Sequence, residues 1–425
     1  MKSNKSRWHG VFTLFAIVII AYIDRINISI LIADRDFLSH MGIVASDRAA
    51  QGLLATAFMI GYGSAAFFLT PFCEALFGVR RSLIYGLLLW GSVTLATPFF
   101  DSYGALLLSR VFLGLSEGPL FALASSYIKS YYDAQENGKP NAILNTGTGI
   151  GLALGYPLIS ALVVGIHWQA SFVVLGLVNI LIGVPLVLAF IRMPVAPDGA
   201  PAKPTFTQAC AKVPTMIHGA LQTRNILLMA AIATMTLAYL WGSGSWLPSY
   251  LKEARGFSFS EMGPLASLPQ WASVVSILLS GVLLDRIERR NVPLLFSASA
   301  LLVALSIYLA INAEDRLVAV GFLTAANFFW GLSYPGVLAL IQYFSKPEYT
   351  ASSCGVALGC AGLVSGLMPL LMGWAIALAS EGGDAKAGFF VGFALLIGTQ
   401  VVIVACSTVI WLRERTFFQA AAIRA

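Results

Sequence analysis

The sequence predicts an all-α membrane protein with twelve transmembrane helices arranged as two six-helix pseudo-repeats. Of the 425 residues, 58% are apolar and 11% are charged, whereas a soluble domain carries about 25% charged residues. Apolar stretches of about 20 residues or more recur along the whole chain, and each is long enough to cross ~30 Å of hydrocarbon as a helix. One of these stretches also has a counterpart in the second half of the chain, which predicts the repeat.

The apolar stretches give the expected helices in order. The first follows the basic start MKSNKSRW, but it is too long for a signal peptide and contains Asp24 and Arg25, so we interpret it as an uncleaved helix. The expected spans are 10–32, 51–71, 82–100, 104–127, 141–163, 168–191, 226–250, 262–284, 292–312, 317–343, 351–378 and 389–411.

Lysine and arginine indicate how the helices are oriented. If both termini are cytoplasmic, the inner segments carry about three times as many of these residues as the outer segments, as the positive-inside rule requires. We therefore expect a multi-pass protein of a bacterial inner membrane with both termini inside. The net charge of +6 then reflects membrane topology, and no nucleic-acid partner is expected; membrane lipid surrounds the protein.

The longest polar stretch, residues 192–225, is rich in Pro and Ala and divides the chain into two halves of similar size. We expect a six-helix bundle over 1–191, a cytoplasmic linker over 192–225 and a second bundle over 226–425. FLGLSEGPLFAL at 112–123 matches FWGLSYPGVLAL at 329–340, in the fourth and the tenth expected helix. Halves related in this way are one known transporter architecture, with substrate held between them at the midplane.

The strongly ionisable residues inside the spans are confined to the first half. They are Asp24 and Arg25 in helix 1 and Arg110 and Glu117 in helix 4. Each costs roughly 2.5 to 3.5 kcal/mol at a helix centre. Arg110 and Glu117, seven residues apart, lie on one helix face, so the four charges can neutralise one another across a contact between helices 1 and 4.

Two interpretations of these charges are open. They could be structural ion pairs, although such pairs are weak evidence for stability, and intramembrane charge usually marks a substrate or proton route. In the functional interpretation, the arginines bind an anionic substrate through the planar guanidinium. The carboxylates carry protons, because burial and a neighbouring Arg change their proton affinity in opposite directions.

Other polar residues are candidates for the substrate cavity. Tyr22 shares a helix face with Arg25. In the repeat, Asn327 and Tyr334 occupy the positions of Arg110 and Glu117. We therefore expect Tyr22, Asn327 and Tyr334 to line the cavity together with Arg25.

Four fragments, YIDRINIS, SRVFLGLSEG, HWQASFVVLG and WLPSYL, resemble the anion:cation symporters of the major facilitator superfamily, in their usual order over essentially the whole chain. The resemblance implies a twelve-helix rocker-switch carrier, and many such proteins move organic anions such as sugar acids together with protons. It implies Arg25 as the contact to the substrate anion, Asp24 and Glu117 as proton carriers, and Arg110 as the residue that links them.

A cytoplasmic loop motif belongs to the same resemblance. GVLLDRIERR at 281–290 matches the superfamily pattern G-x-L-x-D-R-x-x-x-R through its acidic and basic positions. Its first-half counterpart keeps two arginines but has Ala75 where the acidic residue would fall, beside Glu74. The expected gating residues are Arg80, Arg81, Asp285, Arg286 and Arg290.

Several other signals point away from catalysis. The five cysteines form no CxxC pair and the four histidines lie far apart, so we expect no metal site and no cofactor. The glycines of GTGIGLALGYP lie inside a span and predict close helix packing, as do Gly355, Gly359, Gly362 and Gly366. We expect a transporter that works as a monomer, not an enzyme. An exporter of the same fold and a transporter-like sensor remain the alternatives.

Overall fold

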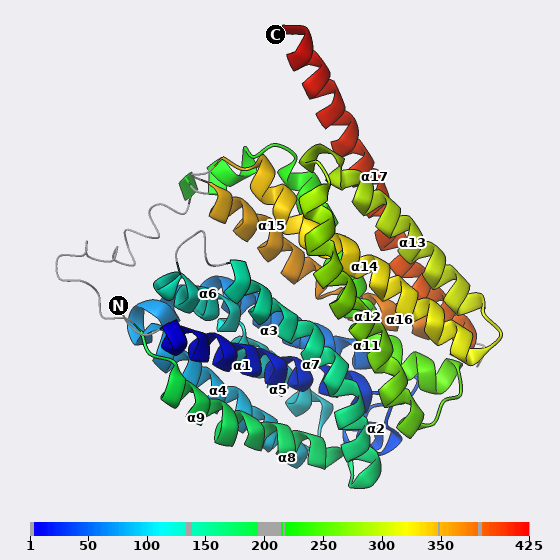
Figure 1. Ribbon diagram of the computed structural model, residues 1–425. Coiled ribbons are helices and arrows are strands. Elements are labelled where there is room, and N and C mark those ends of the chain that lie inside the picture. Colours follow the sequence, from blue (N-terminus) through cyan, green and yellow to red (C-terminus); the bar gives the residue numbers. More distant parts are fainter. Residues whose placement is uncertain are drawn as a thin grey trace. The chain divides into compact units, whose positions relative to one another are not determined.

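The computed structural model describes residues 4–132, 138–193, 214–215, 217–346, 349–380 and 385–424, and this part of the chain forms helices and connecting turns without strands. Helices suit a membrane because they satisfy every backbone hydrogen bond within one segment. The first half contains α1 Asn4–Leu31, α2 Arg35–His40, α3 Arg48–Phe72, α4 Gly78–Ala96, α5 Tyr103–Glu117, α6 Leu120–Tyr131, α7 Gly138–Gly165, α8 Trp168–Val178 and α9 Val184–Phe190 (Figure 1).

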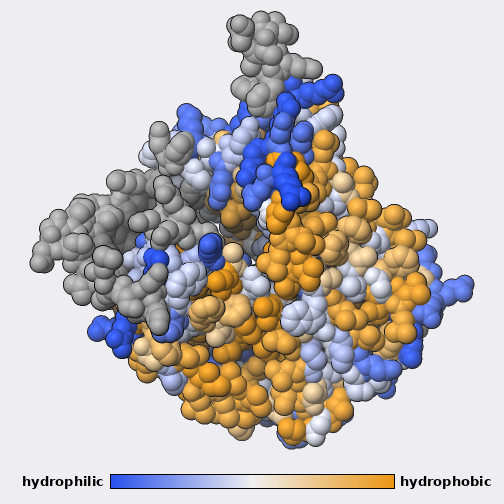
Figure 2. All heavy atoms as spheres, viewed as in Figure 1, coloured by the Kyte–Doolittle hydropathy of each residue, from blue (hydrophilic) through white to orange (hydrophobic). Residues whose placement is uncertain are grey.

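The second half contains α11 Ile226–Ser249, α12 Phe259–Arg286, α13 Val292–Asn312, α14 Arg316–Phe344, α15 Thr350–Ser365, α16 Met368–Ala379 and α17 Ala385–Arg424. Among the described residues, 11 segments are long and apolar enough to cross a membrane. The 25-residue helix α3 supplies the remaining span of the twelve-helix fold. Large apolar side chains are exposed on many helices, and Figure 2 shows them as broad hydrophobic areas on the viewed face.

Several spans are interrupted instead of being single straight helices. The fourth span ends as α5 at Glu117 and resumes as α6 at Leu120, after Gly118 and Pro119. Three π-helical turns, η1 Cys73–Phe77, η3 Asn179–Gly183 and η4 Tyr250–Ala254, extend or interrupt other spans. Two short 3₁₀ turns, η2 Thr97–Phe99 and η5 Arg289–Asn291, lie at the end of α4 and before α13. Such π-turns occur often at functional sites, and η3 proves to adjoin the ionic cluster described below.

Contacts divide the chain into two units, Met1–Ala209 with Ser245–Ser267, and Cys210–Gly244 with Leu268–Ala425. The end of α11, η4 and the start of α12 thus group with the first unit. Within that unit, Arg48 Nη1 donates to Glu253 Oε1 at 3.0 Å, and Ser160 Oγ donates to the Phe259 carbonyl at 2.6 Å. Most of the expected linker, 192–225, lies outside the described residues.

Glycines bring helices of unit 1 close together, as the sequence predicted for α7. A Cβ on Gly151 would lie 2.7 Å from the Ile19 carbonyl oxygen of α1, and Gly147 and Gly155 also face α1. Figure 1 shows α1 and α7 side by side. The same device joins α3 to α5, because a Cβ on Gly114 would lie 2.2 Å from the Phe58 carbonyl oxygen.

Unit 2 has its own apolar core, built on α13 with α14 and α17 and including Phe296, Leu340 and Ile410. The second glycine face predicted from sequence behaves differently from the first. Within the described part of the chain, a Cβ on Gly355, Gly359 or Gly362 would meet no heavy atom within 4 Å. The predicted close packing is therefore not found for these three glycines, because no described residue places an atom within 4 Å of their Cβ positions.

The repeat is visible in the packing of equivalent helices. Gly331 of α14 faces α12, where a Cβ would lie 2.0 Å from Ser276 Oγ and 2.9 Å from the Ser273 carbonyl oxygen. Its counterpart Gly114 faces α3 in the same manner. Ser116 and Ser333 also match, since each hydroxyl donates to the carbonyl three residues earlier, at 2.8 Å and 3.0 Å.

Candidate functional site

Arg25 lies at the centre of a buried ionic cluster in unit 1. Its Nη2 donates to Glu117 Oε1 at 2.8 Å, and the two side chains are only 4% and 2% exposed. The structure therefore joins α1 to the end of α5, across the helix contact expected from sequence. A hydrogen bond of this length between ionised groups is stronger than a neutral one, and it compensates in part for the removal of both charges from water.

Three aromatic rings surround the Arg25 guanidinium. Its Cζ lies 4.2 Å from the ring centroid of Tyr22, 4.6 Å from that of Tyr62 and 5.0 Å from that of Phe58. A cation placed over an aromatic face is attracted by the ring quadrupole, most strongly where water is excluded. The rings therefore stabilise the guanidinium and restrict the directions from which another anion can reach it.

Arg110 occupies the same cluster without the same bonding. Its Cζ lies 5.2 Å from the Phe58 ring, so this ring contacts both guanidiniums. Arg110 interacts electrostatically with Asp24 and Glu117, but its buried Nε has no hydrogen-bond partner among the described residues. A buried guanidinium with an unused donor can bind an incoming anion.

Asp24 is buried, and its carboxylate accepts a hydrogen bond from the π-turn η3, which follows α8, instead of from an arginine. Asn179 Nδ2 donates to Asp24 Oδ2 at 2.6 Å and also lies 2.9 Å from the Leu175 carbonyl oxygen. Both side chains are buried. The cluster therefore contains one closely paired carboxylate, Glu117, and one carboxylate held by a neutral amide, Asp24.

The two candidates in α14 lie in unit 2, in neutral surroundings. The Asn327 side chain is buried, and its Oδ1 accepts a hydrogen bond from the Tyr239 hydroxyl at 2.9 Å. Tyr334 is exposed and stacks on Trp330 at a centroid distance of 4.8 Å. The Trp330 indole in turn donates to the Thr236 carbonyl at 3.0 Å. Hydrogen bonds and ring contacts thus fix Asn327 and Tyr334 from within their own unit.

The loop-motif residues lie at helix ends. Arg80, near the start of α4, donates through Nη2 to the Leu188 carbonyl of α9 at 2.6 Å. Arg81, Asp285, Arg286 and Arg290 are exposed, and the last of these pairs with Glu288. The side chains of Glu74 and Ala75 lie outside the described residues. The gating role of this motif stays a prediction.

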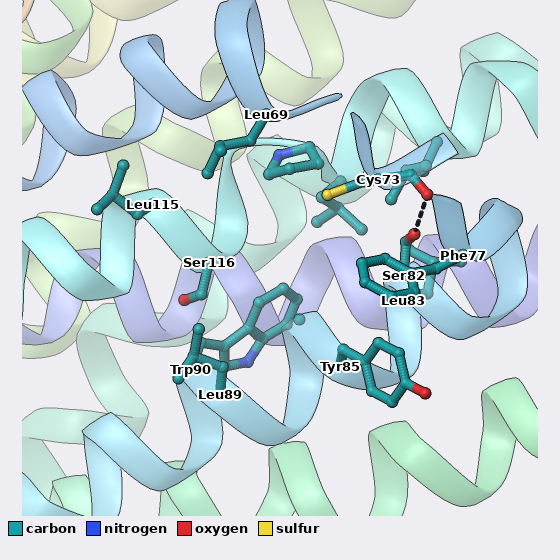
Figure 3. A pocket seen from close by; sticks show the side chains of 14 residues that line it. Leu69, Cys73, Phe77, Ser82, Leu83, Tyr85, Leu89, Trp90, Leu115 and Ser116 are labelled. Carbon is teal, nitrogen blue, oxygen red and sulfur yellow. Dashed lines mark hydrogen bonds between the residues drawn. The ribbon is translucent and has the colours of Figure 1, made fainter. Parts of the chain in front are cut away.

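A separate cavity of about 160 Å³ lies among α3, η1, α4, α5 and α6 (Figure 3). Its lining is mostly apolar, with leucines and aromatic rings around Cys73 and Ser116. The hydroxyl of Ser82 donates to the Cys73 carbonyl at 2.7 Å, the bond drawn in Figure 3. Because the residues that line it include no ionisable member of the cluster, this cavity is not the site that the charges form.

Sequence reasoning missed three residues of the cluster. Phe58 and Tyr62 are four residues apart on α3, a spacing that places them on one face. In a chain with 12% aromatic residues, however, such a pair does not stand out. Asn179 could have been found as an amide inside the apolar span 168–191, but its spacing gives no indication that it reaches Asp24.

Comparisons with known proteins agree with the fold. The sequence pattern of the Major Facilitator Superfamily matches residues 14–369. A solved bacterial homologue of the human lysosomal transporter Spinster, in an inward-facing and unoccupied conformation, is similar with a TM-score of 0.79, at 17% identity and with 98% of each chain covered. At this identity the likeness concerns the fold alone.

Two curated relatives match nearly the whole chain. One is a "probable sulfoacetate transporter" of Cupriavidus necator, 30% identical over 418 residues, with 93% of each chain covered. The other is a "probable galactarate/D-glucarate transporter" of Bacillus subtilis, 25% identical over 440 residues, again with 93% of each chain covered. Both are named as transporters of small acids that are anionic at neutral pH.

Proposed function

Because the chain belongs to the Major Facilitator Superfamily, we propose that it is a proton-coupled symporter that imports a small organic anion, such as a sugar acid or another carboxylate or sulfonate, by alternating access. It is a multi-pass membrane transporter, not an enzyme. The inner membrane of a bacterium, cytoplasmic termini and a single functional copy complete the proposal.

The buried pair of Arg25 and Glu117 is the observation that carries this proposal. Arg25 is already neutralised by Glu117 and enclosed by aromatic rings, so a substrate anion must compete with Glu117 for the guanidinium. Once Glu117 loses this partner, it is an unpaired carboxylate in a buried site, and a buried anion of this kind is unstable unless it takes up a proton. Binding of one anion and uptake of one proton thus become linked.

The proposal places the transported proton on a side chain of the protein and not on the substrate. A sulfonate is a very weak base and stays ionised, so it cannot carry a proton across the membrane itself. In the proposed loaded state with a monoanion, the substrate balances Arg25 and Glu117 is neutral, so the site carries no more net charge than before. A dianion brings one further negative charge, which a second proton, on Asp24, would balance. Moving a neutral assembly through the membrane avoids the electrostatic cost of an uncompensated charge.

The remaining cluster residues have supporting roles in the proposal. Arg110, with its unused Nε, offers a second cationic contact and links Glu117 to Asp24, which acts as a further proton carrier. Tyr22, whose ring lies 4.2 Å from Arg25 Cζ, is a proposed substrate contact beside it. Asn327 and Tyr334 contribute neutral contacts that read hydroxyl groups of the substrate.

The test is proton flux into proteoliposomes that contain a pH-sensitive dye. Sulfoacetate, galactarate, glucarate, aromatic acids and simple dicarboxylates are added outside one at a time, and Arg25→Ala proteoliposomes are the control. Acidification of the lumen with one class of anion is the expected result. Alkalinisation would instead indicate anion–proton antiport, as in an exporter. Uptake of labelled anion without any pH change would contradict proton coupling.

A further inference from the structure

The two hydrogen-bond partners of Asn179 determine the orientation of its side-chain amide. Asn179 Nδ2 lies 2.6 Å from Asp24 Oδ2 and 2.9 Å from the Leu175 carbonyl oxygen. Since both of these neighbours are acceptors, the amide must present its nitrogen to them, and a flipped amide would place its oxygen against two oxygens. Asn179 is therefore a hydrogen-bond donor to Asp24 and cannot act as its acceptor.

The position of Asn179 depends on the backbone around it. Asn179 is the first residue of the π-turn η3, which follows α8 directly. On the side of α4, a Cβ at Gly91 would lie 3.1 Å from Asn179 Cβ and 2.8 Å from Ile180 Cγ1. The absence of a side chain at Gly91 thus lets α4 approach η3, and the close fit leaves Asn179 little room to move.

The charged groups around Asp24 come from two helices. Glu117 and Arg110, both on α5, act on its carboxylate electrostatically with opposite signs, and Arg25 is its neighbour on α1. Within the described part of the chain, Asn179 supplies the side-chain hydrogen bond that Asp24 accepts. This neutral residue therefore makes the direct contact, while the ionic residues act from a greater distance.

We propose that Asn179 is a positioning residue for proton exchange at Asp24: its amide holds one carboxylate oxygen, Oδ2, and favours the ionised form, so that the proton is taken up and released at the other oxygen, Oδ1. A hydrogen bond donated to a carboxylate favours the charged state. A donor that cannot accept gives no equivalent support to a protonated hydroxyl at Oδ2. This inference rests on the proposed proton coupling for its purpose, but not for its geometry.

The proposal predicts the effect of removing the amide. Asn179→Leu keeps a side chain of similar size and deletes the donor, so Asp24 should hold its proton more tightly. We expect the proton affinity of Asp24 to rise at least tenfold, a shift of about one pH unit. Gly91→Ala should shift it in the same direction by less, because it displaces Asn179 without deleting it.

Infrared difference spectroscopy of the purified protein in lipid measures this directly. The carbonyl stretch of protonated Asp24 is assigned as the band lost in Asp24→Asn and is followed from pH 5 to pH 9. Ser171→Ala is the matched control, because Ser171 is a buried residue of α8 whose hydroxyl bonds to the Trp168 carbonyl. The expected result is a higher midpoint in Asn179→Leu and an unchanged one in Ser171→Ala.

The outcomes separate this inference from the proposed function. A midpoint in Asn179→Leu equal to that of the unsubstituted protein would overturn the role of Asn179, and so would an Asp24 band that does not titrate in any variant. If the midpoint shifts while proteoliposomes show no anion-dependent proton flux, the positioning role stands and the symport proposal fails. If flux is present, its pH profile should shift with the band in both Asn179→Leu and Gly91→Ala.

Discussion

The end of α5 in unit 1 and the middle of α14 in unit 2 share their packing residues and differ in their chemistry. Gly114 and Gly331 each press their helix against a neighbour, and Ser116 and Ser333 make the same local hydrogen bond. Glu117, by contrast, pairs with an arginine, whereas its counterpart Tyr334 stacks on an indole. The two halves therefore share the residues that set the spacing between helices, and they differ at the position of Glu117 and Tyr334.

This difference assigns separate tasks to the two regions. When one member of a buried ion pair loses its partner, the charge that remains must be balanced by another ion. In unit 1 the substrate anion and a proton could provide this balance for Arg25 and Glu117. The Tyr239–Asn327 hydrogen bond is neutral and has no comparable link to pH. If the proposed function holds, this difference predicts that proton coupling depends on unit 1 and that unit 2 contributes to affinity and selectivity.

The largest effect should come from removing the central cation. In Arg25→Ala, Glu117 loses its partner, and breaking a buried pair in this way costs about 3 to 5 kcal/mol. We expect anion binding, measured by calorimetry in detergent, to become undetectable. Arg25→Lys is the control that keeps the charge and loses the planar fork, and it should retain weak binding. Binding of normal strength in Arg25→Ala would contradict the assignment.

Glu117→Gln should separate binding from coupling. The amide keeps the shape of the protonated carboxyl, so exchange of labelled anion across the membrane should persist while accumulation driven by a pH gradient disappears. Over the pH range in which Glu117 gains or loses its proton in the normal protein, the transport rate of the variant should not change with pH. Intact pH-driven accumulation would show that the proton is carried elsewhere and would remove the main contrast between the two units.

The sequence was enough to predict the helices, the repeat and the four charges, because hydrophobic length and the cost of buried charge are local properties. It also predicted the faces of Gly147, Gly151 and Gly155, since four-residue spacing defines one side of a helix. It could not show which carboxylate pairs with which arginine, because that depends on how α1, α5 and η3 meet in space.

The missed residues have the same explanation. Asn179 reaches Asp24 through a π-turn whose position no pattern of apolar residues indicates. In the sequence, Phe58 and Tyr62 cannot be distinguished from other aromatic residues of membrane helices. Their contact with Arg25 follows from the packing of α3 in the fold. The α15 glycines show the converse error, because a spacing that allows close packing does not supply a partner helix.

A moderate effect is expected from the neutral pair in unit 2. Tyr239→Phe leaves Asn327 Oδ1 without its donor, and an unsatisfied buried acceptor costs about 1 to 3 kcal/mol. Asn327→Ala should weaken anion binding by about tenfold, equivalent to about 1.4 kcal/mol. Both variants should transport the same number of protons per anion as the normal protein, measured as the ratio of dye signal to labelled uptake. A changed ratio would extend coupling into unit 2.

A smaller difference should distinguish the two equivalent glycines. Overpacking a core commonly costs about 1 to 3 kcal/mol. Gly114→Ala should lie at the upper end, because its Cβ would meet a backbone oxygen at 2.2 Å, whereas the closest atom to a Cβ at Gly331 is the Ser276 hydroxyl, which can rotate. Thermal unfolding followed by tryptophan fluorescence should therefore show the lower midpoint for Gly114→Ala. Equal midpoints for the two variants would mean that displacing the α3 backbone costs no more than rotating the Ser276 side chain.

The smallest effect should come from the glycines of α15, and it bears on what they are for. Gly355→Ala places a Cβ where no atom lies within 4 Å, so this conformation should be unaffected or stabilised by up to about 1 kcal/mol through the helix propensity of alanine. Gly151→Ala is the matched contrast, since its Cβ would meet Ile19 and Tyr22 of α1. If Gly355→Ala leaves thermal stability intact and still slows transport, the α15 face must be approached by another helix in a different state of the cycle. If it alters neither property, Gly355 has no role in transport, and it differs from its counterpart face on α7 in function as well as in packing.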